Sequence, residues 1–235
     1  MPLSSLRKDL RGLTDAKKAQ VLSRFFKTGP GEYGEGSKFL GVTVPKLRAI
    51  AGRHPDLSLA ELEVLLASPL HEERAVALMI LSRLYSKGDE ERKKTCFEFY
   101  LRNIDKVNNW DLVDGSAPGI VGARLARRSR APLRRWANSK SLWRRRIAIL
   151  ATFHFIKQGE FEETLHIAEM LLDDKEDLIH KAVGWMLREV GKRDLAAEQA
   201  FLRAHCKQMP RTMLRYAIER FPEKKRKAYL AGTVS

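Results

Sequence analysis

Apolar residues recur at helical spacing through nearly the whole chain, and this pattern limits the fold more than any other feature of the sequence. Segment 70–87 is a clear case, with its apolar side chains every three or four positions. Helix-start signals precede several such segments: Ser58 and Glu61 form an S-x-x-E capping box, and Ser141 precedes a strong amphipathic stretch. Strand-like alternation between turn signals is essentially absent. The sequence therefore predicts an all-α protein.

The expected helices are joined by short connections, except for the glycine-rich segment 28–42, which we expect to be the longest loop. Successive helices with short links pack as antiparallel hairpins, and hairpins every 35–45 residues predict an α-solenoid of HEAT-like type with a basic concave face. An irregular helical domain is the alternative, and in either case residues 1–235 are expected to form one domain. The expected helices are Ser4–Leu13, Thr14–Lys27 with Thr14 as N-cap, Thr43–Gly52, a helix from Ser58 that ends by Pro69, Leu70–Lys87, Asp89–Val107, Trp110–Arg128 with a kink near Pro118, Pro132–Asn138, Ser141–Gln158, Phe161–Leu172, Glu176–Val190, Leu195–Gln208, Arg211–Arg220 and Glu223–Leu230.

Positive charge is concentrated in the middle of the chain. The net charge is +15, and residues 101–157 alone hold 13 basic and 3 acidic side chains. Residues 115–159 contain 11 Lys and Arg and no acidic residue. A solvated face is the ordinary explanation of a charge run. Because this run is long and single-signed, we instead expect a polyanionic partner.

Several classes of protein are excluded or disfavoured. No apolar run approaches the roughly 20 residues of a transmembrane helix, and the N-terminus has no apolar core of a signal peptide. Cys96 and Cys206 are far apart and are expected to be reduced thiols in a cytoplasmic protein. Phosphate-binding loops, metal-ligand spacings and nucleophile elbows are absent, and the six histidines show no ligand-like pairing. We therefore expect no cofactor, metal or membrane partner, and a monomer.

Two acidic residues close together in sequence, Asp111 and Asp114, lie inside the basic region. Trp110 and Asp114 are four residues apart and share a helix face, whereas Asp111 points elsewhere and suits the first turn of a helix. Asp114 is followed by 45 residues without an acid, so it stays ionised; its alternative role is a salt bridge to an arginine. Arg146 lies on an apolar stripe, where a charge must be paired or face a cleft. Trp185 follows the mid-helix Gly184, and is either a core residue or a ligand contact.

Three blocks in this order resemble the AlkD family of DNA alkylpurine glycosylases, whose fold is built of HEAT-like repeats. They are Trp110–Asp114, Arg146–Leu150 and Lys181–Glu189, and weaker similarity extends to the segment from Tyr33 to Pro45. The sequence departs from some members at Asn109, where they have a second tryptophan.

The resemblance implies a base-excision-repair enzyme that hydrolyses the N-glycosidic bond of cationic N3- or N7-alkylated purines in double-stranded DNA. Asp114, Trp110 and Trp185 match the family's catalytic cleft, and Arg146 and Tyr33 match DNA contacts. A non-catalytic binder of damaged or branched DNA, a protein scaffold and an RNA binder are the alternatives, the first because some members bind DNA without glycosylase activity. The other residues expected to bind DNA are Arg124, Arg127, Arg128, Lys140, Arg144, Arg145, Lys181 and Arg188.

Overall fold

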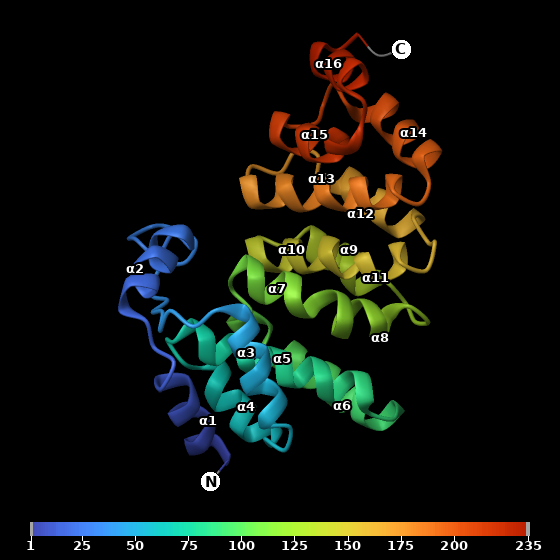
Figure 1. The fold of residues 1–235 in the computed structure, drawn as a ribbon. Helices are drawn as coiled ribbons and strands as arrows, with labels where there is room; N and C mark the ends of the chain where they lie inside the picture. Colours follow the sequence, from blue (N-terminus) through green and yellow to red (C-terminus); the bar gives the residue numbers. More distant parts are fainter. Residues whose placement is uncertain (1, 234–235) are drawn as a thin grey trace. The chain divides into compact units, whose positions relative to one another are not determined.

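The computed structural model describes residues 2–233, which are helical apart from their connections and one isolated parallel bridge between Lys38 and Leu70. The all-α prediction is therefore confirmed. The chain divides into two compact units, with the boundary between Ser116 and Ala117 (Figure 1). We call them the N-terminal and the C-terminal unit and describe each by itself. That the whole chain is one domain stays a prediction.

In the N-terminal unit, α5 is the central helix and packs against α3, α4 and α6. Its apolar face carries fully buried Ile80 and Leu81, and α4 contributes Leu62 and Leu65. The loop from residue 26 to 43 contains no helix, as predicted. The helices are α1 (Pro2–Arg11), α2 (Ala16–Phe25), α3 (Val44–Arg53), α4 (Leu59–Leu66), α5 (His71–Lys87), α6 (Glu90–Arg102), the 3-10 turn η1 (Ile104–Lys106) and α7 (Trp110–Ala117), whose last residue is the first of the C-terminal unit.

In the C-terminal unit, α13 is central and packs against α10, α12, α14 and α15. Gly184 explains one of these contacts, because a Cβ at this position would lie 2.4 Å from the Met213 carbonyl oxygen of α15. The close approach at Gly184 is therefore made by another helix backbone. The elements are η2 (Pro118–Gly122), α8 (Ala123–Leu125), α9 (Ala131–Ala137), α10 (Leu142–Ala151), α11 (Phe153–Ile156), α12 (Glu162–Met170), α13 (Asp177–Gly191), α14 (Leu195–His205), α15 (Arg211–Ala217), η3 (Ile218–Arg220) and α16 (Glu223–Ala231).

Two of the predicted helix limits are wrong for local reasons. Asp15, not Thr14, is the N-cap of α2, because its carboxylate accepts a hydrogen bond from the Lys18 N–H at 3.0 Å. The helix that begins after Ser141 does not run unbroken to residue 158. It ends at Ala151, where the Thr152 hydroxyl donates to the Ile149 carbonyl, and α11 follows.

Other predicted limits are confirmed. The Ser58–Glu61 capping box forms with both of its hydrogen bonds, and Ser141 caps α10. The predicted distortion near Pro118 is a π-helical segment, η2, between α7 and α8.

Candidate functional site

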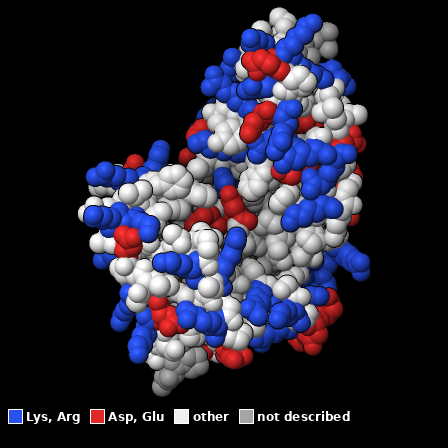
Figure 2. Space-filling view, viewed as in Figure 1, with Lys and Arg blue, Asp and Glu red and all other residues white. Residues whose placement is uncertain are grey.

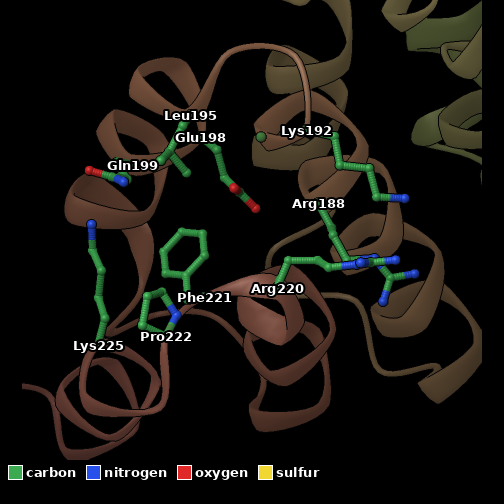
Figure 3. Close-up of a pocket in the computed structure, with 10 residues that line it drawn as sticks. Arg188, Lys192, Leu195, Glu198, Gln199, Arg220, Phe221, Pro222 and Lys225 are labelled. Carbon is green, nitrogen blue, oxygen red and sulfur yellow. The ribbon is translucent and has the colours of Figure 1, made fainter.

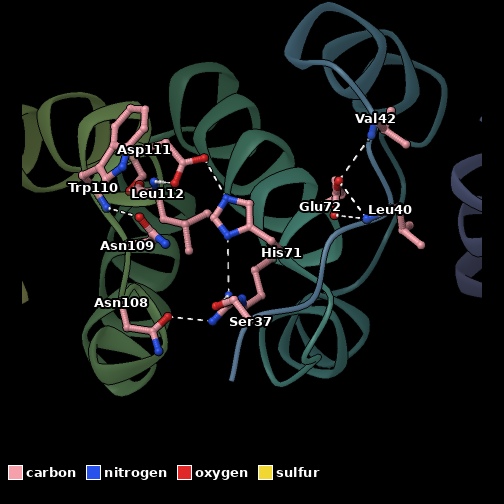
Figure 4. Close-up of polar contacts among 12 residues, drawn as sticks. Ser37, Leu40, Val42, His71, Glu72, Asn108, Asn109, Trp110, Asp111 and Leu112 are labelled. Carbon is pink, nitrogen blue, oxygen red and sulfur yellow. Dashed lines mark hydrogen bonds and ion pairs between the residues drawn. The ribbon is translucent and has the colours of Figure 1, made fainter. Parts of the chain in front are cut away.

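The first turn of α5 buries charges that bind the loop before α3. Glu72 is 1% exposed, and its carboxylate accepts hydrogen bonds from the backbone N–H groups of Leu40, Gly41 and Val42 at 2.9–3.2 Å (Figure 4). Arg74, also buried, donates to the Asn108 side chain and to the Ser37 hydroxyl, both at 2.7 Å. Every bond joins segments at least 30 residues apart, so the α5 terminus fixes both the 37–42 loop and the approach to α7.

Asp111 and Asn109 hold the start of α7. The Asp111 carboxylate lies 2.7 Å from Nε2 of buried His71 and also accepts from the Leu112 N–H. The side chain of Asn109, fully buried, accepts from the Trp110 N–H at 2.8 Å. Asp111 is thus in the first helical turn, as predicted, and it additionally binds His71 of α5. These contacts fix the orientation of α7 and therefore the direction in which the side chains of Trp110 and Asp114 point.

Trp110 lies in an aromatic cluster that the sequence analysis did not find. Its ring stacks on Phe26 with centroids 4.9 Å apart and planes 8° from parallel, and Phe25 approaches it edge-on at 5.8 Å. Phe26 in turn contacts Phe39 and His71. Phe25 and Phe26, two adjacent aromatic residues at the end of an amphipathic helix, are the sequence feature that could have predicted this cluster. Because Trp110 is half-buried, one part of the indole is fixed by packing while another part reaches the surface.

Asp114 lies one helical turn beyond Trp110 and is half-buried. The hydroxyl of Tyr100, on α6, is 3.2 Å from the Ser116 hydroxyl. Burial raises the pKa of Tyr100, and the negative charge of Asp114 raises it further. Asp114 therefore presents a carboxylate beside a buried, apolar part of the unit, where its field is screened less than in water.

A cavity of about 410 Å³ opens beside this cluster within the N-terminal unit. Its wall includes Phe26, Phe39, His71 and Asp111, so the aromatic cluster and the His71–Asp111 pair both border it. Phe25 beside it is 62% exposed. The N-terminal unit therefore combines exposed aromatic surface, a cavity and two carboxylates near Trp110.

In the C-terminal unit, Trp185 is half-buried on α13. Its ring is 5.8 Å from that of Phe153, and its Nε1–H donates to Glu189 at 3.2 Å. Arg146 is only 4% exposed and donates to the Leu178 carbonyl at the start of α13. The charge on the apolar stripe of α10 is thus satisfied by a backbone carbonyl, which gives Arg146 a structural contact.

Acidic residues later in the chain neutralise part of the acid-free run. Arg130 pairs with Glu160, Arg134 with Glu163 and Arg145 with Asp174. Lys and Arg are numerous on the visible face of both units in Figure 2.

The remaining predicted DNA contacts differ in exposure. Lys181 pairs with Asp177 at 2.7 Å, Arg188 pairs with Glu219, and the half-buried Tyr33 donates to the Phe25 carbonyl at 3.4 Å. The other members are exposed or partly exposed: Arg124, Arg127, Arg128, Lys140 and Arg144.

Within 2–233, no group of three His, Cys, Asp or Glu side chains could hold a metal ion. Over the same part of the chain, no helix combines the length and the apolar character required to cross a membrane.

Comparison with known proteins identifies the family. The model of the DNA alkylation repair enzyme family matches residues 6–221. The chain belongs to this family. A solved structure described as a predicted DNA alkylation repair enzyme from Enterococcus faecalis is similar in fold, with a TM-score of 0.69 over 89% of this chain and 97% of that chain, at 15% sequence identity. No curated protein matches the chain. Membership supports an enzymatic role in the repair of alkylated DNA.

Proposed function

We propose that the protein is a DNA glycosylase that hydrolyses the N-glycosidic bond of purines alkylated at N3 or N7 in double-stranded DNA. The observation that carries the proposal is the pair on α7: an ionisable carboxylate, Asp114, one helical turn from a half-exposed tryptophan, Trp110, in a member of the DNA alkylation repair family.

The chemistry of the lesion explains why so few groups are needed. Alkylation at N3 or N7 gives the base a positive charge, so it leaves without being protonated. When the C1′–N bond breaks, its electron pair neutralises the base and the sugar becomes oxocarbenium-like. Water then forms the C1′–O bond and loses a proton. Catalysis therefore requires stabilisation of positive charge on the sugar and an acceptor for that proton.

Asp114 meets both requirements. Its carboxylate stabilises the cationic sugar electrostatically and accepts the proton of the attacking water. The polar contacts of His71, Asp111 and Asn109 fix α7, so the carboxylate is oriented before the substrate binds.

The tryptophans provide faces for a cation. A cation over an indole ring is stabilised by about 0.5–2 kcal/mol. Trp110 is held for this role by Phe26, and the family resemblance assigns the same role to Trp185. Lysines and arginines bind DNA phosphates, which gives affinity without sequence preference. The proposed contacts include Arg146, whose backbone bond to Leu178 adds a structural function.

The test is release of N7- or N3-methylpurine from alkylated duplex DNA by wild type and by Asp114→Asn, under single-turnover conditions. The substitution keeps size and removes the charge, so the rate should fall by about tenfold to a thousandfold, equivalent to about 1.4–4 kcal/mol. DNA affinity should stay equal or rise, because a negative charge is lost. Arg146→Ala, by contrast, should weaken both rate and binding.

Asp56→Asn is the matched control, because Asp56 is exposed in the turn between α3 and α4 of the same unit. It should leave rate and affinity unchanged. If Asp114→Asn releases methylpurine at the wild-type rate, Asp114 is not the catalytic carboxylate. If wild type releases none while binding damaged DNA, the protein is instead a non-catalytic binder of damaged DNA.

A further inference from the structure

A second pocket, of about 640 Å³, lies wholly within the C-terminal unit and is distant in sequence from Trp110 and Asp114. It is bordered by α13, α14 and the segment that joins η3 to α16 (Figure 3). The residues that matter for its chemistry are Arg188, Lys192, Glu198, Arg220, Phe221 and Lys225.

Glu198 is the unusual member of this set. It is only 2% exposed, and its Oε1 has no hydrogen-bond partner in the protein. Burial raises the pKa of Glu198 to about 8, although the charges of Arg188 and Lys225 act in the opposite direction. At neutral pH the group is therefore mostly a neutral carboxylic acid, which can donate one hydrogen bond and accept another.

The fold makes space for this side chain. A Cβ at Gly191, on the last turn of α13, would lie 1.6 Å from Glu198 Oε2, so a larger residue there would displace the carboxyl group from its position. A buried polar atom without a hydrogen-bond partner destabilises the fold, and a ligand that pairs with Oε1 removes that cost.

The remaining walls are cationic and aromatic. Arg188 is paired with Glu219 and Lys192 with Glu189, while Arg220 and Lys225 add further positive charge. Arg188 Nε is buried without a hydrogen-bond partner. Phe221 provides an apolar wall, with the Lys225 ammonium 5.2 Å from its ring centroid.

These features together require a ligand of mixed character. A simple anion would leave Glu198 unpaired, and a simple cation would be repelled by the four basic residues. We propose that the pocket binds a single nucleotide, whose base pairs with Glu198 beside Phe221 and whose phosphate is bound by the basic side chains. A nucleobase presents an N–H next to an acceptor, which matches a carboxylic acid, and the protein belongs to a family that acts on DNA. The proposal does not depend on the glycosylase reaction.

The test is isothermal titration of the full-length protein with AMP, ribose 5-phosphate and adenosine at pH 7. AMP should bind at least about tenfold more tightly than ribose 5-phosphate, which lacks the base, or adenosine, which lacks the phosphate. Absence of AMP binding at millimolar concentration, or equal affinity for ribose 5-phosphate, would overturn the proposal.

Two substitutions at residue 198 separate recognition from folding. Glu198→Leu places an apolar side chain of similar size in a buried position, so the protein should fold, and AMP affinity should fall at least about tenfold. Glu198→Gln keeps a neutral donor and acceptor and should bind AMP within about threefold of wild type. Glu169→Leu, an exposed position on α12, is the matched control. Unchanged affinity in a folded Glu198→Leu would contradict the assignment.

The source of the nucleotide is decided by competition. If a single-stranded oligonucleotide displaces AMP, the pocket takes a nucleotide of DNA; if it does not, the pocket takes a free nucleotide. Asp114→Asn should bind AMP like wild type. If the wild-type protein binds AMP but releases no methylpurine, the proposed glycosylase function fails and the pocket proposal stands. If it releases methylpurine but does not bind AMP, the pocket proposal fails and the glycosylase function stands.

Discussion

Glu198 should make the protein less stable as the pH rises through neutrality. Its pKa is about 8 in the folded protein, because burial disfavours the charged form, and its ordinary value is 4.5. Between these values the folded state keeps a proton that the unfolded state has lost. The unfolded state therefore binds fewer protons, and the free energy of unfolding falls with increasing pH.

The size of the effect follows from the two pKa values. Each pKa unit corresponds to about 1.4 kcal/mol, so the whole window from 4.5 to about 8 is on the order of 5 kcal/mol. Between pH 5.5 and 7.5 the contribution of Glu198 should decrease by about 3 kcal/mol. This is a large part of the 5–15 kcal/mol typical of a folded domain.

The assay is urea unfolding of wild type and Glu198→Gln at pH 5.5, 6.5, 7.5 and 8.5. Glutamine cannot titrate, so the difference between the two proteins isolates Glu198. His154, whose pKa is lowered mainly by burial, titrates in both proteins and cancels. From pH 5.5 to 7.5, the free energy of unfolding of Glu198→Gln should rise by about 3 kcal/mol relative to that of wild type. Glu223→Gln, at an exposed position on α16, should follow wild type. Parallel pH curves for wild type and Glu198→Gln would refute the reasoning.

Three further predictions follow from the proposed function and its site. Affinity for duplex DNA should decrease about a hundredfold between 50 and 200 mM salt in a filter-binding or anisotropy assay, and a salt-independent affinity would contradict an electrostatic interface. Release should be confined to cationic adducts, because no general acid is assigned to activate a neutral leaving group; chromatography of the products should detect no uracil or hypoxanthine, and uracil excision at a comparable rate would refute the assigned chemistry. Glu72→Gln should lower the free energy of unfolding by about 2–4 kcal/mol in urea denaturation, because the carboxylate accepts hydrogen bonds from three backbone N–H groups. A change below about 0.5 kcal/mol would show that the 37–42 loop is stable without these hydrogen bonds.

The parts of the fold that depend on neighbouring residues could be predicted from the sequence. The Ser58–Glu61 capping box and the N-cap Ser141 act within one helical turn, and both form. Pro118 lacks a backbone N–H, so a helix distortion nearby follows from covalent structure alone. The prediction of Thr14 as N-cap was wrong because adjacent residues can both cap a helix, and only the backbone decides which side chain faces the free N–H groups.

The candidate site depends on contacts that no local pattern shows. His71, Glu72 and Arg74 stand at the start of a helix, where charged residues are usually solvated. Each is buried because its partners come from segments 30 or more residues away in sequence. Gly184 could be recognised as a point of close approach, but the identity of the approaching group required the position of α15.

Ion pairs in the folded C-terminal unit change what the run of positive charge implies. The sequence has 11 basic residues and no acid in 115–159, and this predicts a bound polyanion, because such a run repels itself. In the folded unit three of these basic residues pair with acids that follow 159 in the sequence, so part of the repulsion is relieved without DNA. A hundredfold loss of affinity over a fourfold rise in salt corresponds to about four neutralised phosphates. The exposed members of the run outside these three ion pairs suffice for that number: Arg127, Arg128, Arg135, Lys140 and Lys157. We therefore expect the DNA affinity to depend on the exposed basic residues rather than on the net charge. Substitution of one of these five should reduce the salt slope by about one unit, while Arg145→Ala should reduce it less.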